Sequence, residues 1–519
     1  MHKPGITIFL YIFIIVVTSW LVVSRLTPYG SATMPDSLAY LDIANNIKNG
    51  EGFLTSDFSL DNAGTHSFTE NRSWPPLYPC LLSIFINNAS DISSVSLVSK
   101  FLLGVCIVFV FLIIYPVNGS AAFISSLLLC FTVPVITVYT YAWSETLFLP
   151  IFIVLVWASI EYLDIHRRSL IYRITISSIL LTMMILLVYT RYIGLFFVVL
   201  FPVVYFFSNK DTFDRLFFAA GSFVYTAAVC YLLYGNYIIS GSISGMVRQP
   251  SDKTIIENLV DVYHAVITIF PTSTLSLILA LIAAVSVVFI IKKSGIYKIS
   301  PINKKLRRRV YILIAVIAVY LLSIISLRSY SRFDILDVRL LAPAFVAIYM
   351  LMTILPLFFD INNGTRITFS IVIFAFITSV SINGYTQWTT TANNWKEAET
   401  PKLRLNDKLI YNNFTRSPET RSRNIKMFSG LVKDGGFIVV NAPLVCKFIT
   451  GVKCVRKPDN ITPEIITKIN SLPGGSLLFL DKNELNEFNN RYAGMAVDYK
   501  YTDLGNIMAI KLPIHISTQ

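Results

Sequence analysis

Long apolar segments run through most of this chain and constrain its fold more than any other feature. Each is as long, or nearly as long, as the roughly 20 residues that a helix needs to cross the hydrocarbon core of a bilayer. They lie near 5–25, 93–116, 119–139, 145–163, 172–189, 192–207, 215–234, 272–291, 310–327, 340–358 and 367–385. The sequence therefore predicts a polytopic α-helical membrane protein with about eleven transmembrane helices.

The composition is typical of the same class. Of the 519 residues, 54% are hydrophobic and only 14% are charged. The formal net charge of +13 could indicate nucleic-acid binding, but the basic residues concentrate in short loops between the apolar segments. We therefore expect membrane lipids, and no nucleic acid, among the partners. The first segment is too long for the core of a signal peptide, so we expect it to be a retained helix.

The basic loops also set an orientation. Loop 292–309 carries eight lysines and arginines and loop 164–173 carries three arginines, and short loops rich in these residues stay in the cytoplasm. Alternate crossing then exports segment 26–92, the turns near 140–145 and 190, loops 235–271 and 328–339, and everything after about 386. We expect the plasma (inner) membrane of a bacterium, with the active site and the C-terminal domain on the exported side.

The first exported segment has a pattern of its own. Residues 36–49 read as an amphipathic helix with Asp36 at its N-cap and Asn49-Gly50 at its end. After the Trp74 to Pro79 stretch, the apolar run 80–86 is too short to span, and we interpret it as interfacial or re-entrant.

The tail changes composition. The short apolar runs 437–440, 477–480 and 508–510 predict strands, and segment 462–471 predicts a helix with Pro463 at its start. Together they predict a small exported α/β domain with a partly parallel sheet. We therefore divide the chain into a transmembrane domain, 1–386, which includes the first loop, and an α/β domain, 387–519. No GxGxxG or P-loop supports a nucleotide-binding enzyme.

The six cysteines indicate no metal site and at most one disulfide. None forms a CxxC pair, so a zinc site is not expected. Cys446 and Cys454 lie in the polar tail and could form one disulfide if it is exported, and two packed thiols are an equally good interpretation.

Two carboxylates are placed on the exported side. Asp36 follows the first crossing, and Glu145 follows Ser144 at the start of the fourth span. Each also has a plain structural explanation, Asp36 as a helix cap and Glu145 as a charge that suits a helix N-terminus. Their convergence beside a low dielectric favours a catalytic role, because such a carboxylate can be tuned as a base.

Three arginines share that side. They are Arg191, Arg248 and Arg339, and each could simply extend its charge toward water. Basic residues are disfavoured in short exported loops, however, and guanidinium is a natural fork for phosphate. We therefore predict that they bind the phosphate of a donor.

The motifs around these residues resemble a family. They are Asp36-x3-Tyr40-x3-Ala44 with Gly50-x-Gly52, Pro75-Pro76-Leu77-Tyr78-Pro79, Ser144-Glu145-Thr146-Leu147-Phe148, Thr190-Arg191-Tyr192, the Gly241 to Arg248 stretch and Arg339-Leu340-Leu341-Ala342-Pro343. In order and topological side they resemble the GT-C superfamily of integral-membrane glycosyltransferases, in particular the protein O-mannosyltransferase and lipid A aminoarabinose transferase branch. The resemblance covers about residues 5–345.

The resemblance implies a polyprenyl-phosphate-linked sugar donor, a hydroxyl acceptor on lipid A, a surface glycan, a lipid or a protein, and a catalytic acid at Asp36. Tyr40, Tyr78 and Tyr192 lie within the matching motifs and are expected in the substrate pocket. Many relatives carry a second acid directly after the first, where this chain has Ser37. We predict no metal site and no required cofactor, although Glu145 could complete a divalent site.

Chemistry supports the same mechanism without the resemblance. The leaving group is a membrane-anchored phosphate whose charge arginines can stabilise, so a divalent ion is not required. A carboxylate that takes the acceptor proton, for which Asp36 is the candidate, would give a single inverting displacement. The alternatives are a flippase or other transporter of lipid-linked sugars and a non-catalytic membrane scaffold. Transporters usually carry broken helices and internal repeats, which this sequence does not show.

Overall fold

A computed structural model describes most of the chain. The described residues are 4–28, 30–56, 69–70, 72–164, 169–208, 210–269, 304–358, 363–397, 437–440, 443–450, 453–456, 462–470, 477–481, 486, 495–503 and 507–518. The chain divides into two compact units, which we describe separately. Unit 1 comprises residues 1–26, 72–78 and 99–392, and unit 2 comprises residues 27–71, 79–98 and 393–519.

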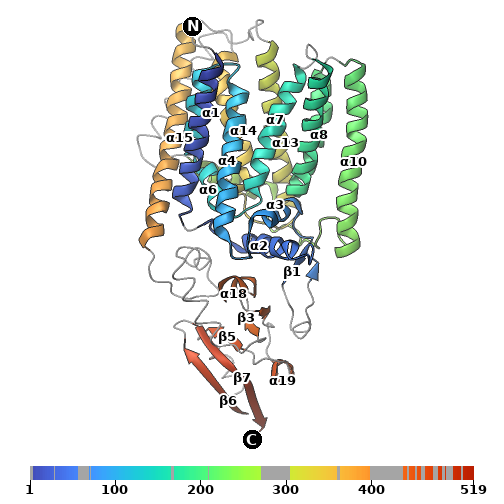
Figure 1. Ribbon diagram of the computed structural model, residues 1–519, viewed down its shortest axis with the longest axis vertical. Coiled ribbons are helices and arrows are strands. Elements are labelled where there is room, and N and C mark those ends of the chain that lie inside the picture. Colours follow the sequence, from blue (N-terminus) through green and yellow to red (C-terminus); the bar gives the residue numbers. More distant parts are fainter. Residues whose placement is uncertain are drawn as a thin grey trace. The chain divides into compact units, whose positions relative to one another are not determined.

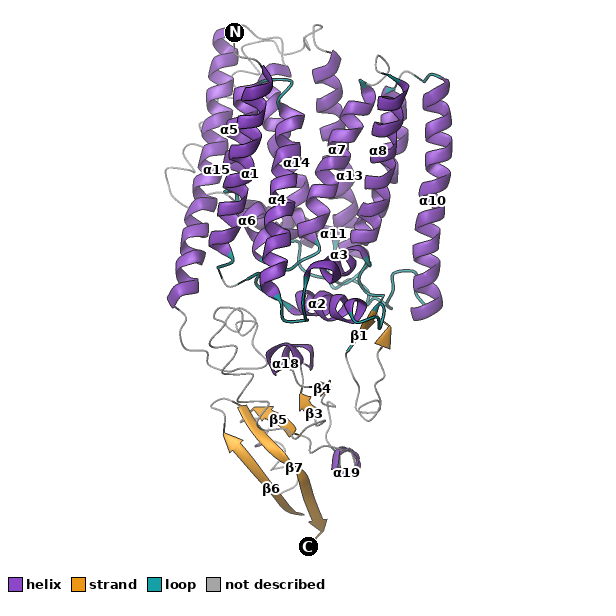
Figure 2. Cartoon of the chain, in the orientation of Figure 1, coloured by secondary structure: helices purple, strands orange, loops and turns teal. Residues whose placement is uncertain are grey.

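Eight described helices are long and apolar enough to cross a membrane, which confirms the polytopic helical class. They are α1 (Pro4–Leu26), α4 (Ile92–Ile114), α7 (Glu145–Leu163), α8 (Leu170–Thr190), α10 (Thr212–Ser240), α13 (Lys304–Tyr330), α14 (Val338–Phe358) and α15 (Asn363–Glu397). Figure 1 shows them standing side by side, and Figure 2 shows how completely helix dominates this part of the chain.

Two of the predicted spans differ from simple helices. The segment predicted at 119–139 is a broken pair, α5 (Gly119–Leu129) and α6 (Val133–Thr140), which meet at 53°. The expectation that the chain has no broken helices was therefore wrong. The break precedes Pro134, whose ring lacks the N–H that a continuing helix would use. The segment predicted at 192–207 starts as the 3-10 helix η3 (Tyr192–Val199) and continues as α9 (Leu200–Phe207). The segment predicted at 272–291 lies outside the described residues.

In unit 1, one helix lies where the sequence predicted a loop. α11 (Ile255–Ile269) lies in the loop expected at 235–271. Its exposed side is largely apolar, with Ile256, Leu259 and Tyr263 among the residues on it. Asn258 on the other side is fully buried and donates to the Ser329 hydroxyl at 2.9 Å. A helix that faces outward with its apolar side has the wrong pattern for a soluble loop and the right one for contact with lipid.

The interior of unit 1 is aromatic where α7, η3 and α13 meet. Phe148 and Phe152 of α7, Phe197 of η3 and Tyr320 of α13 have ring centroids 5.5 to 6.4 Å apart. The buried Tyr320 hydroxyl donates to the Leu340 carbonyl of α14 at 2.6 Å. This cluster fixes the helix ends that carry the residues described below.

Unit 2 contains the first predicted surface helix. α2 spans Pro35–Lys48 and ends at Asn49, followed by Gly50 with φ +82°. Its entry is fixed by Gly30, where φ is +107° and an added Cβ would lie 2.8 Å from the carbonyl carbon of Ile92. The hairpin β1 (Leu54–Thr55) and β2 (Thr69–Glu70) follows α2. The apolar run predicted near 80–86 is a short helix, α3 (Leu77–Phe85).

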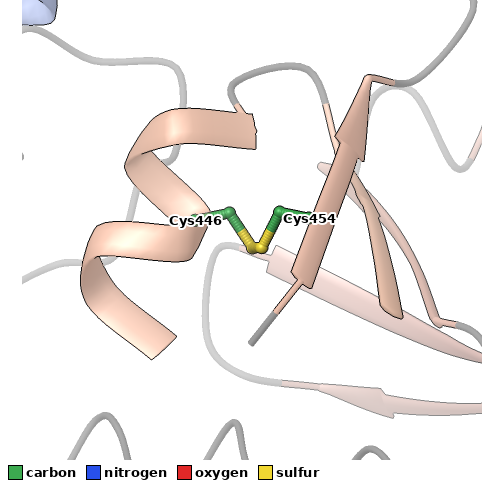
Figure 3. The surroundings of a disulfide bond; sticks show 2 residues. All are labelled: Cys446 and Cys454. Atoms are coloured by element: carbon green, nitrogen blue, oxygen red, sulfur yellow. A yellow bond between two sulfur atoms is a disulfide. The ribbon is translucent and has the colours of Figure 1, made fainter. Parts of the chain in front are cut away.

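The C-terminal part of unit 2 is a mixed five-stranded sheet in the order β4-β3-β5-β7-β6. Strands β3 (Phe437–Val440), β4 (Lys453–Arg456) and β5 (Leu477–Asp481) are parallel, whereas β6 (Met495–Asp503) and β7 (Ile507–Thr518) pair antiparallel. Two helices, α18 (Pro443–Thr450) and α19 (Pro463–Asn470), complete it. The predicted small α/β fold with a partly parallel sheet is confirmed. Cys446 and Cys454 form a disulfide with their Cα atoms 6.0 Å apart (Figure 3).

Candidate active site

Glu145 is the centre of a charged cluster in unit 1. It is the first residue of α7, and only 6% of its side chain is exposed. Its Oε1 atom lies 2.5 Å from Nη1 of Arg191 and 3.4 Å from Nε of Arg339. Ser144 joins the cluster, because its hydroxyl donates to Oε2 of Glu145 at 3.3 Å and accepts from Arg191 at 3.3 Å. Glu145, Arg191 and Arg339, which the sequence placed on one side of the membrane, therefore lie together in the structure.

Arg191 occupies a sharp break in the chain. It ends α8 and precedes η3, with extended backbone angles of φ −153° and ψ 136°. The chain can fold back there because Gly194 lies against the end of α8, where an added Cβ would come within 2.4 Å of the Leu187 carbonyl carbon. The close packing of Gly194 on Leu187 fixes the backbone next to Arg191, and the contacts with Glu145 and Ser144 fix its guanidinium.

Arg339 is almost enclosed by acidic partners. It lies in the first turn of α14 and is paired with Glu145, with Asp334 and, at 3.9 Å, with Asp337. Its guanidinium also lies 4.5 Å from the ring centroid of Trp143, a favourable cation–π arrangement. Burial raises the pKa of Asp337. The two aspartates and Trp143 are parts of the site that the sequence analysis did not single out.

Arg248 lies in a different setting. It ends the glycine-containing loop after α10, and among the residues that the structure describes it has no carboxylate partner. Burial lowers its pKa, and the neighbouring Arg191 cation lowers it further, while Tyr192 acts in the opposite direction. A half-buried cation beside another cation favours an anion as its neighbour.

The loop that carries Arg248 is held in place through Tyr192. The Tyr192 hydroxyl donates to the Arg72 carbonyl at 2.8 Å and accepts from Asn236 at 2.8 Å, and Asn236 also donates to the Ile243 carbonyl at 3.0 Å. Gly245, with φ +76°, lies so close to Arg72 that an added Cβ would come within 1.7 Å of the Arg72 carbonyl oxygen. The loop geometry therefore depends on a glycine at this position.

A second anchor holds the other side of Arg248. The buried Arg328, at the end of α13, pairs with Asp252 at 2.7 Å and donates to the Ser251 hydroxyl at 3.1 Å. The Ser251 hydroxyl in turn donates to the Arg328 carbonyl at 2.7 Å. Arg328 has only 2% of its side chain exposed, so this pair fixes residues 249–254 firmly and limits how far Arg248 can move.

The three predicted pocket tyrosines lie in different surroundings. Tyr192 belongs to the hydrogen-bonded network of Arg248, as described above. Tyr78 is buried in unit 1 with 1% exposure next to Thr146, and burial raises its pKa. Tyr40 is a buried residue of α2 in unit 2, with 5% exposure.

Asp36 lies in the first turn of α2 and is half-buried. The prediction that it forms the N-cap was wrong. The N-cap is Met34, and the Met34 backbone N–H donates to the Ser37 hydroxyl at 3.1 Å. Pro35 opens the helix at a position where its missing N–H is not needed. The cap therefore does not explain why an acid stands at Asp36, which belongs to unit 2, whereas the charged cluster belongs to unit 1.

The described residues offer no group of three or more His, Cys, Asp or Glu side chains that could hold a metal ion. Glu145, the residue considered as a further ligand, faces two guanidinium groups. A carboxylate bound in this way has its lone pairs directed at arginine N–H groups, and it would have to break those ion pairs to ligate a metal.

This chain is similar to known proteins in fold but not in sequence. No protein-family model matches this chain, and no curated protein matches its sequence. Among solved structures, ArnT from Cupriavidus metallidurans bound to undecaprenyl phosphate is similar, with a TM-score of 0.56 and 8% identity over 98% of each chain. The arabinofuranosyltransferase AftD from Mycobacteria is similar over 96% of this chain and 40% of its own, with a TM-score of 0.51 and 11% identity. The chain therefore shares the fold of ArnT and of AftD.

Proposed function

We propose that this chain is a GT-C glycosyltransferase that moves a sugar from a polyprenyl-phosphate-linked donor to a hydroxyl acceptor. The observation that carries the proposal is the likeness in fold over 98% of both chains to ArnT bound to undecaprenyl phosphate. The acceptor is lipid A, a surface glycan, another lipid or a protein. The reaction takes place on the exported face of a bacterial plasma membrane.

The arginine cluster supports a phosphate as the group that is bound and released. Arg248 has no carboxylate partner among the described residues, whereas Arg339 contacts Glu145, Asp334 and Asp337. An incoming phosphate therefore competes least with the protein's own acids at Arg248. We assign Arg248 and Arg191 to direct contact with the donor phosphate, and Arg339 to a contact that is shared with its carboxylates.

Asp36 is the proposed base. The acceptor hydroxyl oxygen attacks the anomeric carbon while Asp36 takes its proton, and the bond from that carbon to the phosphate oxygen breaks. The electron pair leaves with the lipid phosphate, whose charge the arginines stabilise. A single displacement of this kind inverts the anomeric centre. Glu145 is buried against two arginines, so we assign it to positioning them rather than to proton transfer.

Mass spectrometry of cell-surface glycans and lipids, with and without the protein, tests the proposal. Loss of the protein should remove one sugar from one class of glycoconjugate and increase the amount of the lipid-linked donor. Restoring the parent chain should reverse both changes. The proposal fails if every glycan and lipid is the same in the two strains while the protein is present in the membrane of one of them.

A further inference from the structure

A buried acid in α2 has no part in the proposed reaction. Asp42 has only 4% of its side chain exposed, and its Oδ1 atom lies 2.8 Å from Nζ of Lys447 in the C-terminal domain. Its Oδ2 atom accepts from the backbone N–H of Ser56 at 2.6 Å, and Lys447 also donates to the Ser56 hydroxyl at 2.6 Å. One lysine thus joins α2, the segment after β1, and α18, which all belong to unit 2.

The helix that carries Lys447 is held by a covalent bond. α18 has eight residues, which is too short for a helix to be stable through its own hydrogen bonds. Cys446, the residue directly before Lys447, is joined to Cys454 of β4 (Figure 3). β4 pairs in parallel with β3 over four residues. The disulfide therefore links the backbone next to Lys447 to β4, the edge strand of the sheet.

Helix geometry separates Asp42 from the proposed base. At 3.6 residues per turn, Asp42 lies roughly 120° around α2 from Asp36 and roughly 160° from Tyr40. Asn46 shares the face of Asp42 and donates to the Leu54 carbonyl at 2.8 Å. Lys447 thus contacts one face of α2, and Asp36 and Tyr40 lie on another face.

We propose that Lys447 is a positioning residue, which through Asp42 and with the Cys446–Cys454 disulfide sets the rotation of α2 and hence the place of Asp36. The C-terminal domain thereby takes part in transfer without touching the substrates. This inference rests on the proposed function for its effect on turnover, but its effect on α2 itself does not depend on that function.

The first test is kinetic and uses the full-length protein in nanodiscs. Lys447→Met removes the charge, whereas Lys447→Arg keeps it and can still reach a carboxylate. Because misplacing a reacting group by 1 Å can cost on the order of 100-fold in rate, we expect Lys447→Met to lower kcat by roughly tenfold to 100-fold. The donor KM should be unchanged, and Lys447→Arg should restore most of the rate. Lys468→Met, which removes a lysine from the exposed side of α19 in the same domain, is the matched control and should behave like the parent.

The second test asks whether the lysine, the acid and the disulfide act as one device. Asp42→Asn and the paired change Cys446→Ser with Cys454→Ser should each lower kcat in the same way as Lys447→Met. Combining any two should cost little more than one alone, because residues that act together give non-additive effects. Fully multiplicative losses would contradict a single device.

The third test needs no transfer at all. Hydrogen exchange of the α2 amides between residues 38 and 48 should become faster in Lys447→Met and in the cysteine variant, with the exchange of α7 and α8 unchanged. If the parent shows no transferase activity while α2 loosens as expected, the proposed function fails and the positioning role stands. If exchange in α2 is the same in parent and variant, or if Lys447→Met turns over like the parent, the positioning role is overturned.

Discussion

Oε1 of Glu145 lies 2.5 Å from Nη1 of Arg191, so the acid at the start of α7 and the arginine at the end of α8 form one ion pair. The same oxygen faces Nε of Arg339 at 3.4 Å. Glu145 thus joins three helices at the ends where the candidate site lies. An acid that serves two arginines in this way organises the site before a substrate arrives, which is the arrangement that electrostatic catalysis requires.

Glu145→Gln tests this organising role. The amide keeps the size of the side chain but leaves two guanidinium groups without their common anion. We expect a loss of about 3 kcal/mol in unfolding free energy, the low end for breaking a buried pair, because 25% of the Arg191 side chain is exposed. Denaturant unfolding and donor binding in detergent measure the two effects. Unchanged stability together with abolished transfer would instead indicate a direct chemical role for Glu145.

The arginines should not be equivalent. Arg248→Ala should weaken donor binding or turnover by about 2 to 4 kcal/mol with little change in stability, because it removes no ion pair with a described residue. Arg339→Ala should lower stability as well, because it removes the arginine partner of Asp334 and Asp337 and one of the two arginine partners of Glu145. Arg191→Ala should fall between them.

Lysine replacements at the same positions distinguish a need for a guanidinium group from a need for positive charge alone. Arg248→Lys should restore little donor affinity, because a phosphate prefers a guanidinium fork to a single ammonium. Donor titration and single-turnover transfer, measured beside thermal melting, separate the contributions. If all three alanine variants bind and turn over the donor like the parent, the phosphate site lies elsewhere.

Gly245 offers a substitution with a matched control. Gly245→Ala would place a Cβ within 1.7 Å of the Arg72 carbonyl oxygen, at a backbone φ of +76°. Gly241→Ala introduces a similar backbone strain at φ +68° but meets nothing within 4 Å. We expect the Gly245 variant to lose donor affinity as Arg248→Ala does, and the Gly241 variant to keep it. Equal effects in the two variants would show that backbone strain, and not the packing on Arg72, controls the loop.

The orientation of the chain is a separate prediction. Replacing the exposed Cys80 and Cys230 by serine gives a background for labelling with a membrane-impermeant thiol reagent. Because the basic loop 292–309 should remain in the cytoplasm, a cysteine at Ser294 should react only after the membrane is opened. One at Ser517 should react from outside. The reverse pattern would place the candidate site on the cytoplasmic face and contradict the proposed reaction.

The hydropathy pattern predicted most of the fold because a membrane span leaves a signal that is local in sequence. The strands at 437–440 and 477–480 were predicted for a similar reason. The predicted helix starts were wrong where a local hydrogen bond or a close backbone contact changed the start of the helix. The Ser37 hydroxyl accepts from the Met34 N–H, and the N-cap of α2 lies two residues before the predicted cap at Asp36. Gly194 lets η3 fold back on α8, so the 192–207 segment does not begin as a regular helix.

The partners of the candidate residues were harder to predict than the residues themselves. The alternate crossing of the spans indicated that Glu145, Arg191 and Arg339 lie on one side of the membrane, because it fixes which helix ends are exported. The pairing of Lys447 with Asp42 joins residues 405 positions apart, and no periodicity in a single sequence records such a contact. The same holds for Trp143 under Arg339, since an aromatic residue near a helix start is usually read as packing.

Reconstituted transfer tests the central claim most directly. The purified protein in nanodiscs receives a polyprenyl-phosphate sugar and a mixture of envelope acceptors, and the released polyprenyl phosphate and the glycosylated product are quantified by mass spectrometry. The parent should form both in equal amounts with an inverted anomeric linkage, whereas Asp36→Asn should bind the donor and form neither, because the amide cannot accept the acceptor proton. Near-normal product from Asp36→Asn, or movement of intact donor across the membrane of proteoliposomes with no product from the parent, would contradict the account.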